Sequence, residues 1–101
     1  MSGTELGFLT TLEDIIVERK TSPAEGSYTS ELFAAGRQRI AQKVGEEAIE
    51  VALASTSGNR EATINESADL LYHLLVLLTD QGIQLTDVTD ILEKRHKGHV
   101  A

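Results

Sequence analysis

Five carboxylates near the middle of the chain carry its clearest chemical signal. They form a Glu-Glu-x-x-Glu group followed by a Glu-x-x-Asp pair, and they are Glu46, Glu47, Glu50, Glu66 and Asp69. Residues three apart share one face of a helix, so Glu47 pairs with Glu50 and Glu66 pairs with Asp69. Carboxylates gathered away from bulk water repel one another unless a cation compensates their charge. Because oxygen-only ligands suit hard divalent cations, we predict a site for Mg²⁺, with Mn²⁺ as the alternative.

A turn near Gly58 is the element that must bring the two pairs together. Gly58 stands halfway between Glu47 and Asp69, and also halfway between Glu50 and Glu66. The small polar residues on either side of it are typical of a compact turn. A helical hairpin closed at this turn is expected to place Glu50 level with Glu66, and Glu47 level with Asp69.

Helices are the elements that the sequence predicts throughout. The chain has one proline and little of the alternation typical of strands, and its apolar residues recur with helical spacing, so we expect an all-α fold. The expected helices cover residues 10–20, 30–55, 60–80 and 87–97. The second of them is expected to be divided at Gly36 into a short helix and a long one.

Capping residues predict where these helices begin and end. Thr10 and Glu13 have the spacing of a capping box at the start of the first helix. Thr29 or Ser30 is expected to cap the second helix, and Thr86 is expected to cap the last one. Gly82 is expected to end the helix over residues 60–80.

The helix expected over residues 60–80 gives the stronger indication of a site. Leu70–Leu78 is apolar on almost every side, whereas Glu66, Asp69 and His73 share one sector about 60° wide. A helix that is apolar all round is normally buried all round. Its two acids are therefore the least expected to be idle surface groups.

The preceding helix carries the other acids at the edge of an apolar arc. Lys43, Glu47 and Glu50 fall together at this edge, and Glu46 lies further round the helix. This spacing favours Glu47 and Glu50 as inner metal ligands. Glu46 is expected to be peripheral or to bind a second metal ion.

Composition excludes several classes of protein. The chain of 101 residues has Lys+Arg 9 against Asp+Glu 16, a net charge of −7, and no cysteine. An acidic chain is a poor partner for a phosphate backbone, so we expect no nucleic-acid binding. The sequence offers no run of about 20 apolar residues and no signal peptide, so we expect no membrane association. These features predict one small cytoplasmic domain without disulfides or thiolate metal sites.

Two segments resemble a known family. Lys43–Glu50 and Asn65–Leu78 are similar to the phosphoribosyl-ATP pyrophosphohydrolases of histidine biosynthesis, which belong to the all-α, MazG-like nucleotide pyrophosphohydrolases. Members of this superfamily share the pattern E-E-x-x-E followed by E-x-x-D. The triplet Ser27-Tyr28-Thr29 and the stretch Leu92–His96 fit the same family, so the resemblance covers nearly the whole chain.

The resemblance implies an activity and a set of site residues. The activity is hydrolysis of the α–β phosphoanhydride of 1-(5-phosphoribosyl)-ATP, which gives phosphoribosyl-AMP and pyrophosphate. The fold implied is a bundle of four to five helices, completed by homodimerisation, in a single domain over residues 1–101. The metal would be held by Glu47, Glu50, Glu66 and Asp69. The residues expected to act in catalysis are Glu46, as the candidate base, Glu47 and Lys43. Those expected to bind the nucleotide substrate are Ser27, Tyr28, Thr29, Arg37, Lys43, His73, Lys94 and Arg95.

Other interpretations of the same residues stay open. A housecleaning enzyme acting on dUTP or a damaged triphosphate would share the metal site, and a helical dimerisation module would need no catalysis. His73 could be a core histidine with satisfied hydrogen bonds, and Thr29 could simply cap a helix. A homodimer is expected because the leucine-rich helix, together with Ile49 and Leu53, needs more apolar neighbours than one chain supplies.

Overall fold

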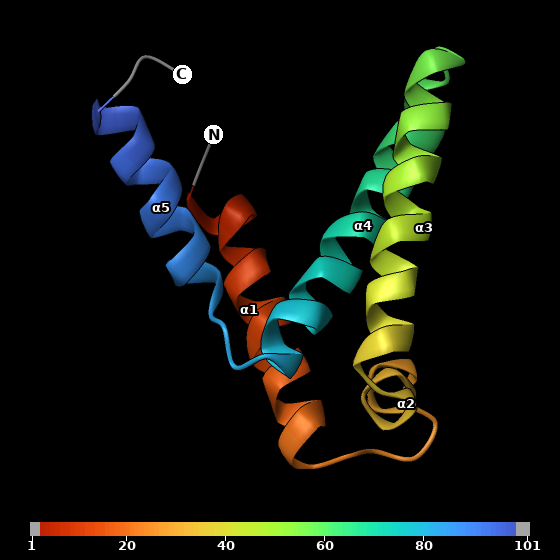
Figure 1. Ribbon diagram of the computed structural model, residues 1–101, viewed down its shortest axis with the longest axis vertical. Helices are drawn as coiled ribbons and strands as arrows, with labels where there is room; N and C mark the ends of the chain where they lie inside the picture. Colours follow the sequence, from red (N-terminus) through yellow and green to blue (C-terminus); the bar gives the residue numbers. More distant parts are fainter. Residues whose placement is uncertain (1–2, 99–101) are drawn as a thin grey trace.

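The structure, a computed structural model, describes residues 3–98 and consists there of five helices without a strand (Figure 1). They are α1 (Gly3–Thr21), α2 (Tyr28–Ala35), α3 (Arg37–Thr56), α4 (Arg60–Asp80) and α5 (Leu85–Gly98). This confirms the all-α prediction. No helix in this part of the chain is long and apolar enough to cross a membrane.

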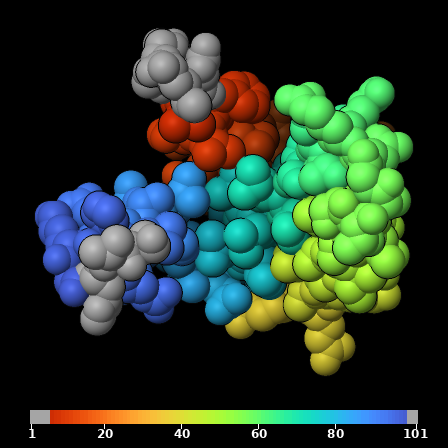
Figure 2. Space-filling view, turned by 90° about the horizontal axis from the view of Figure 1, so that it is seen from above, coloured from red at the N-terminus to blue at the C-terminus, as the bar shows by residue number. Residues whose placement is uncertain are grey.

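The helices form two arms that diverge from a common base. The α3–α4 hairpin makes one arm, and α1 makes the other, while the short α2 lies at the base and links them (Figure 1). The second half of α4 crosses α1 near this base. From the end of α4, α5 runs away from α3, so that α4 lies between α5 and α3 in both views (Figures 1 and 2).

The hydrophobic core lies where α1, α2, α3 and α4 meet. One or two residues from each of these helices are buried in it, and they are Ile16, Leu32, Ile40, Leu75 and Val76. Helix α5 contributes no buried residue of its own. The core therefore fixes the α3–α4 hairpin against the base of α1 and leaves the far ends of both arms outside it.

The α3–α4 hairpin follows the sequence prediction closely. Helix α4 covers residues 60–80, as predicted, and Asn59 caps it by accepting a hydrogen bond from the Ala62 N–H at 3.0 Å. Gly58 has a φ of +74°, a left-handed conformation that favours glycine at the turn. The predicted turn is thus confirmed, and it makes α3 and α4 antiparallel.

The end of α4 is also set by local hydrogen bonds. Gly82 adopts a φ of +72° and donates to the Thr79 carbonyl at 3.0 Å, while Ile83 donates to the Leu78 carbonyl at 2.9 Å. This pair of bonds is the Schellman arrangement that satisfies the last carbonyls of a helix. Gly82 therefore stops α4 as predicted, one residue beyond the cap residue Gln81.

The predicted start of the first helix is wrong. Helix α1 begins at Gly3 rather than at Thr10, so that Thr10 and Glu13 lie inside it. The Glu13 carboxylate closes no capping box; it accepts a hydrogen bond from the backbone N–H of Leu85, the first residue of α5, at 2.6 Å. The side chain that the local pattern assigned to a helix cap thus bonds instead to a segment 72 residues away in the sequence.

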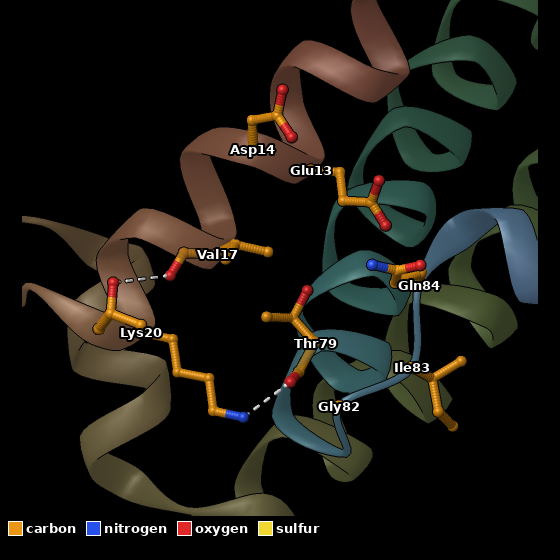
Figure 3. A pocket seen from close by; sticks show the side chains of 9 residues that line it. Glu13, Asp14, Val17, Lys20, Thr79, Gly82, Ile83 and Gln84 are labelled. Atoms are coloured by element: carbon orange, nitrogen blue, oxygen red, sulfur yellow. Dashed lines mark hydrogen bonds between the residues drawn. The ribbon is translucent and has the colours of Figure 1, made fainter.

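A second tie joins α1 to the end of α4. The Lys20 ammonium donates to the Thr79 carbonyl at 2.9 Å (Figure 3) and to the Asp80 carbonyl at 3.3 Å, where the last carbonyls of a helix attract positive charge. A cavity of about 420 Å³ lies beside this contact, between α1 and the α4–α5 turn. None of the predicted site residues lines it.

The predicted caps of α2 and α5 also need correction. Ser27 caps α2 by accepting from the Ser30 N–H at 3.1 Å, so neither Thr29 nor Ser30 is the cap. Gly36, at a φ of +100°, separates α2 from α3 as predicted.

Helix α5 begins at Leu85, and Thr86 therefore lies within it rather than capping it. The carboxylate of Asp87 accepts from the Gln84 N–H at 2.9 Å and satisfies the backbone before the first turn. The side chain that bonds to the backbone at the start of α5 is thus Asp87, the third residue of the helix, and not the predicted Thr86.

Candidate metal-binding site

Three of the five predicted carboxylates meet between α3 and α4. Glu47 comes from α3, and Glu66 and Asp69 come from α4, where they lie about one turn apart. One oxygen of each side chain lies within 4.8 Å of one oxygen of both others. The antiparallel hairpin closed at Gly58 is what brings these residues together.

Two oxygens of this group are buried without a hydrogen-bond partner. They are Oε2 of Glu47 and Oε2 of Glu66, and the whole Glu47 residue is only 6% exposed. Leaving a buried acceptor unsatisfied costs about 1–3 kcal/mol, and more when it is charged. A hard cation bound between these oxygens would remove that cost. The residues therefore fit Mg²⁺, because they offer oxygen ligands and two of these oxygens have no hydrogen-bond partner.

Lys43 supplies the positive charge next to this cluster. Its ammonium lies 3.3 Å from Glu47 Oε1 and 3.9 Å from Glu46 Oε1. The hydrogen bond to Glu47 is the main cause that raises the Lys43 pKa, with smaller contributions from Tyr28 and Glu46. When ionised, the three clustered carboxylates and Lys43 leave two uncompensated negative charges, the charge that one divalent cation balances.

The remaining two predicted acids lie outside the cluster. Glu50 is exposed on α3 and is not among the three clustered carboxylates. Glu46 accepts from the Gln42 amide at 3.2 Å, with its side chain 43% exposed. Equal distance from Gly58 set Glu50 level with Glu66 along the hairpin, but the rotation of α3 points Glu47 at α4 instead. A position along a helix axis does not fix the direction of a side chain.

His73 is buried one turn beyond Asp69, and both its ring nitrogens are used within the chain. Nδ1 lies 2.7 Å from the Asp69 carbonyl, and Nε2 lies 3.1 Å from the Tyr28 hydroxyl. Because a carbonyl only accepts, Nδ1 must carry the proton, and Nε2 of the neutral ring then accepts from Tyr28. His73 thus has the contacts of a satisfied core histidine, and it connects α2 to α4 beside the carboxylates.

The triplet Ser27-Tyr28-Thr29 is divided between local and tertiary contacts. Ser27 caps α2, whereas the hydroxyl of Thr29 is hydrogen-bonded to the hydroxyl of Tyr72 on α4. Burial is the main cause that raises the Tyr72 pKa. The rings of Tyr28 and Tyr72 stack with centroids 6.2 Å apart. Sequence reasoning missed Tyr72; its hydroxyl within a leucine-rich helix was the available signal.

Three predicted substrate-binding cations lie elsewhere. Arg37 donates to the Asp80 carboxylate at 2.7 Å, and Asp80 is roughly 16 Å beyond Asp69 along α4. Lys94 and Arg95 are exposed on α5, which lies across α4 from α3 (Figure 2). Within residues 6–98 of one chain, Lys43 is the cation that the structure pairs with the cluster.

Residues 9–96 match the family described as phosphoribosyl-ATP pyrophosphohydrolase. The chain belongs to this family. The match takes in the carboxylate cluster, Lys43 and the aromatic contacts around His73, and it confirms the resemblance seen in the sequence.

Curated relatives are similar over most of the chain. The protein named "Histidine biosynthesis bifunctional protein HisIE" from Photobacterium profundum is 56% identical over 91 residues, which are 90% of this chain and 44% of that protein. Proteins of the same name are 53% identical in Vibrio cholerae, over 93% of this chain and 45% of theirs, and 56% identical in Escherichia coli, over 89% and 44%. The chain thus spans less than half the length of these relatives.

Proposed function

We propose that this chain hydrolyses the α–β phosphoanhydride of 1-(5-phosphoribosyl)-ATP to phosphoribosyl-AMP and pyrophosphate, a step of histidine biosynthesis. The observation that carries the proposal is the cluster of Glu47, Glu66 and Asp69, with two buried unpaired oxygens, in a chain of this family. A non-catalytic dimerisation module would have no need for such a costly arrangement. We place the reaction in the cytoplasm, which agrees with relatives named for histidine biosynthesis.

Mg²⁺, or Mn²⁺ in its place, is the proposed cofactor. Glu47, Glu66 and Asp69 would hold it, and we assign Glu50 and Glu46 to the exposed side of the same site on α3. When bound, the ion neutralises charge that develops on the phosphate oxygens. The protein's part is to hold five carboxylates on two helices whose relative position the hairpin and the core fix.

The chain's own groups supply the proton transfer and the positive charge. Glu46 is the proposed general base, because its carboxylate is 43% exposed at the edge of the cluster. Its ion pair with the Lys43 ammonium is long, at 3.9 Å, and so leaves the carboxylate open to a water molecule. It would take the proton of the water that attacks the phosphorus. Lys43, whose ammonium lies beside Glu47, would meet the phosphate oxygens, and Lys94 and Arg95 would reach them from a second copy of the chain.

A homodimer is proposed as the working form. Large apolar residues are exposed on both arms of the structure and on α5, and among the most exposed are Leu6, Phe8, Ile49, Leu53, Ile64 and Leu92. Leu71, in the leucine-rich helix, is itself 47% exposed, so one chain does not cover α4 on all sides. Monomers rarely expose apolar surface on this scale. A second copy would cover it and would bring another α5, with its Lys94 and Arg95, to each hairpin.

Release of pyrophosphate from phosphoribosyl-ATP tests the proposal directly. The chain should release it in the presence of Mg²⁺, and replacing Glu47→Gln together with Asp69→Asn should lower the rate by at least about 100-fold, the loss expected when several kcal/mol of charge stabilisation disappear. Glu61→Gln, an exposed acid on the first turn of α4, is the matched control and should leave the rate unchanged. Undiminished release by the double variant would refute the metal site. Faster turnover of dUTP or other free triphosphates would favour the housecleaning function instead.

A further inference from the structure

Tyr28 is unusual because the residue is half exposed and yet its ring is held by several contacts. The residue is 47% exposed. Its hydroxyl donates to His73 at 3.1 Å, its ring meets the His73 ring edge to face at 5.8 Å, and it stacks against Tyr72 at 6.2 Å. An exposed side chain on a helix usually keeps its rotamer freedom. These contacts fix the Tyr28 ring before any ligand binds.

The groups that hold Tyr28 are themselves fixed. His73 is 5% exposed and is anchored to the Asp69 carbonyl, and the hydroxyl of Tyr72 is bonded to Thr29. All of these contacts come from the turn of α4 that follows Asp69. The orientation of the Tyr28 ring is therefore set relative to the carboxylate cluster, although Tyr28 belongs to a different helix.

Tyr28 is joined to the carboxylate cluster through His73. Nε2 of His73 accepts from the Tyr28 hydroxyl and Nδ1 lies 2.7 Å from the Asp69 carbonyl, while the Lys43 ammonium on α3 lies 3.3 Å from Glu47. An ammonium from α3 and an aromatic ring from α2 thus both adjoin the carboxylate cluster. A nucleotide whose polyphosphate lies at the carboxylates would bring its base within reach of the ring.

The hydroxyl of Tyr28 is poorly suited to bind phosphate. A phenol has one O–H donor, and this one is given to Nε2 of His73, so only lone pairs are left to face an anion. The ring face has no such conflict. Both tyrosines of the sequence are gathered here, whereas Phe33 packs against the core and Phe8 is exposed on α1.

We propose that the open face of Tyr28 stacks on the purine base of the substrate and makes Tyr28 a specificity-determining residue. This inference rests on the proposed function, because it takes the substrate to be a purine nucleotide. Stacking accepts any flat π-face and is worth about tenfold or more in affinity per base. His73 and Tyr72 hold the ring ready, which lowers the entropy lost when the base binds.

Two substitutions separate the ring from its hydroxyl. Tyr28→Leu removes the π-face, and Tyr28→Phe keeps it without the hydroxyl. Kinetics with phosphoribosyl-ATP, and calorimetric titration of the Mg²⁺-containing protein with AMP or with inorganic pyrophosphate, would be measured for both. Tyr28→Leu should raise the KM and the Kd of AMP about tenfold, and leave kcat and the Kd of pyrophosphate within about twofold. Tyr28→Phe should raise the KM and the Kd of AMP less than Tyr28→Leu does, since stacking persists although the bond to His73 that helps to hold the ring is lost.

Other outcomes would overturn the inference. If Tyr28→Leu weakens pyrophosphate as much as AMP, the residue acts on the phosphates, and if Tyr28→Phe is as impaired as Tyr28→Leu, the hydroxyl is what matters. Unchanged AMP affinity in Tyr28→Leu would place the base elsewhere. Because AMP and pyrophosphate binding are measured without turnover, a chain that fails to hydrolyse phosphoribosyl-ATP would refute the proposed function while the binding data still decide the stacking.

Tyrosine fluorescence gives a readout that does not depend on the leucine variant. The chain has two tyrosines and no tryptophan, so its emission reports on Tyr28 and Tyr72 alone. AMP should quench this emission in the unmodified chain, and pyrophosphate should not. In Tyr28→Phe, which leaves Tyr72 as the only emitter, AMP should still bind but the quenching should largely disappear. Quenching of equal size in that variant would contradict the stacking.

Discussion

Replacing Glu66→Gln should make the protein more stable without metal and less responsive to metal. Oε2 of Glu66 is buried and unpaired, and Glu66 forms no ion pair with any residue from 6 to 98. The substitution removes one buried negative charge and offers an amide donor to the Glu47 carboxylate, one oxygen of which lies within 4.8 Å of a Glu66 oxygen. A buried unsatisfied group costs about 1–3 kcal/mol, so the free energy of unfolding should rise by about 1 kcal/mol or more. For a domain of this size that corresponds to a Tm about 4–8 °C higher.

Metal should reverse the order of the two proteins. Mg²⁺ at about 100 times its Kd stabilises a native state by about 2.7 kcal/mol, which would raise the Tm of the unmodified chain by about 10 °C or more. Glu66→Gln should show little of this shift because it lacks one ligand. Thermal unfolding followed by circular dichroism, with and without Mg²⁺ and at one protein concentration, measures both effects.

The exposed acid Glu61 provides the matched control for this experiment. Glu61→Gln changes charge on the same helix without touching the cluster, so Mg²⁺ should raise its Tm by as much as that of the unmodified chain. The reasoning fails if Glu66→Gln melts below the unmodified chain in the absence of metal. It also fails if Mg²⁺ does not raise the Tm of the unmodified chain, because the two buried oxygens would then not bind the cation.

Two further predictions concern the stability of the fold at alkaline pH and the proposed homodimer. Burial raises the Tyr72 pKa above its ordinary value of 10.0, so the folded chain keeps a proton that the unfolded chain loses; the stability is complete below pH 10 and falls as the pH rises further. Tyr72→Phe should flatten this decline in alkaline unfolding curves, and an unchanged slope would contradict the cause given. For the dimer, light scattering should give twice the chain mass of 11.0 kDa. If Arg95 serves the partner's site, mixing inactive Glu47→Gln and Arg95→Ala chains should restore about a quarter of full activity, since half the dimers are mixed and each has one intact site. No recovery despite mixed dimers seen by native mass spectrometry would place Arg95 in the site of its own chain, or outside it.

Local signals in the sequence were sufficient for the α3–α4 hairpin. Asn59, Gly58 and Gly82 act on backbone groups within a few residues, so the bounds of α4 could be predicted to the residue. Glu13 shows where this kind of reasoning fails. It has the spacing of a capping box, but its carboxylate bonds to Leu85, 72 residues away. When a side chain can reach both a local and a distant hydrogen-bond partner, its neighbours in the sequence do not determine which partner it binds.

The same distinction applies to the site. The sequence by itself determined which carboxylates are available, that a hairpin brings them together, and which family they indicate, because spacing along a helix and turn chemistry are local properties. Only the tertiary structure decided that Glu47 rather than Glu50 faces Glu66 and Asp69, and that Tyr28 is held by His73. The rotation of a helix about its axis is set by the core that it packs against, through contacts between residues far apart in the chain.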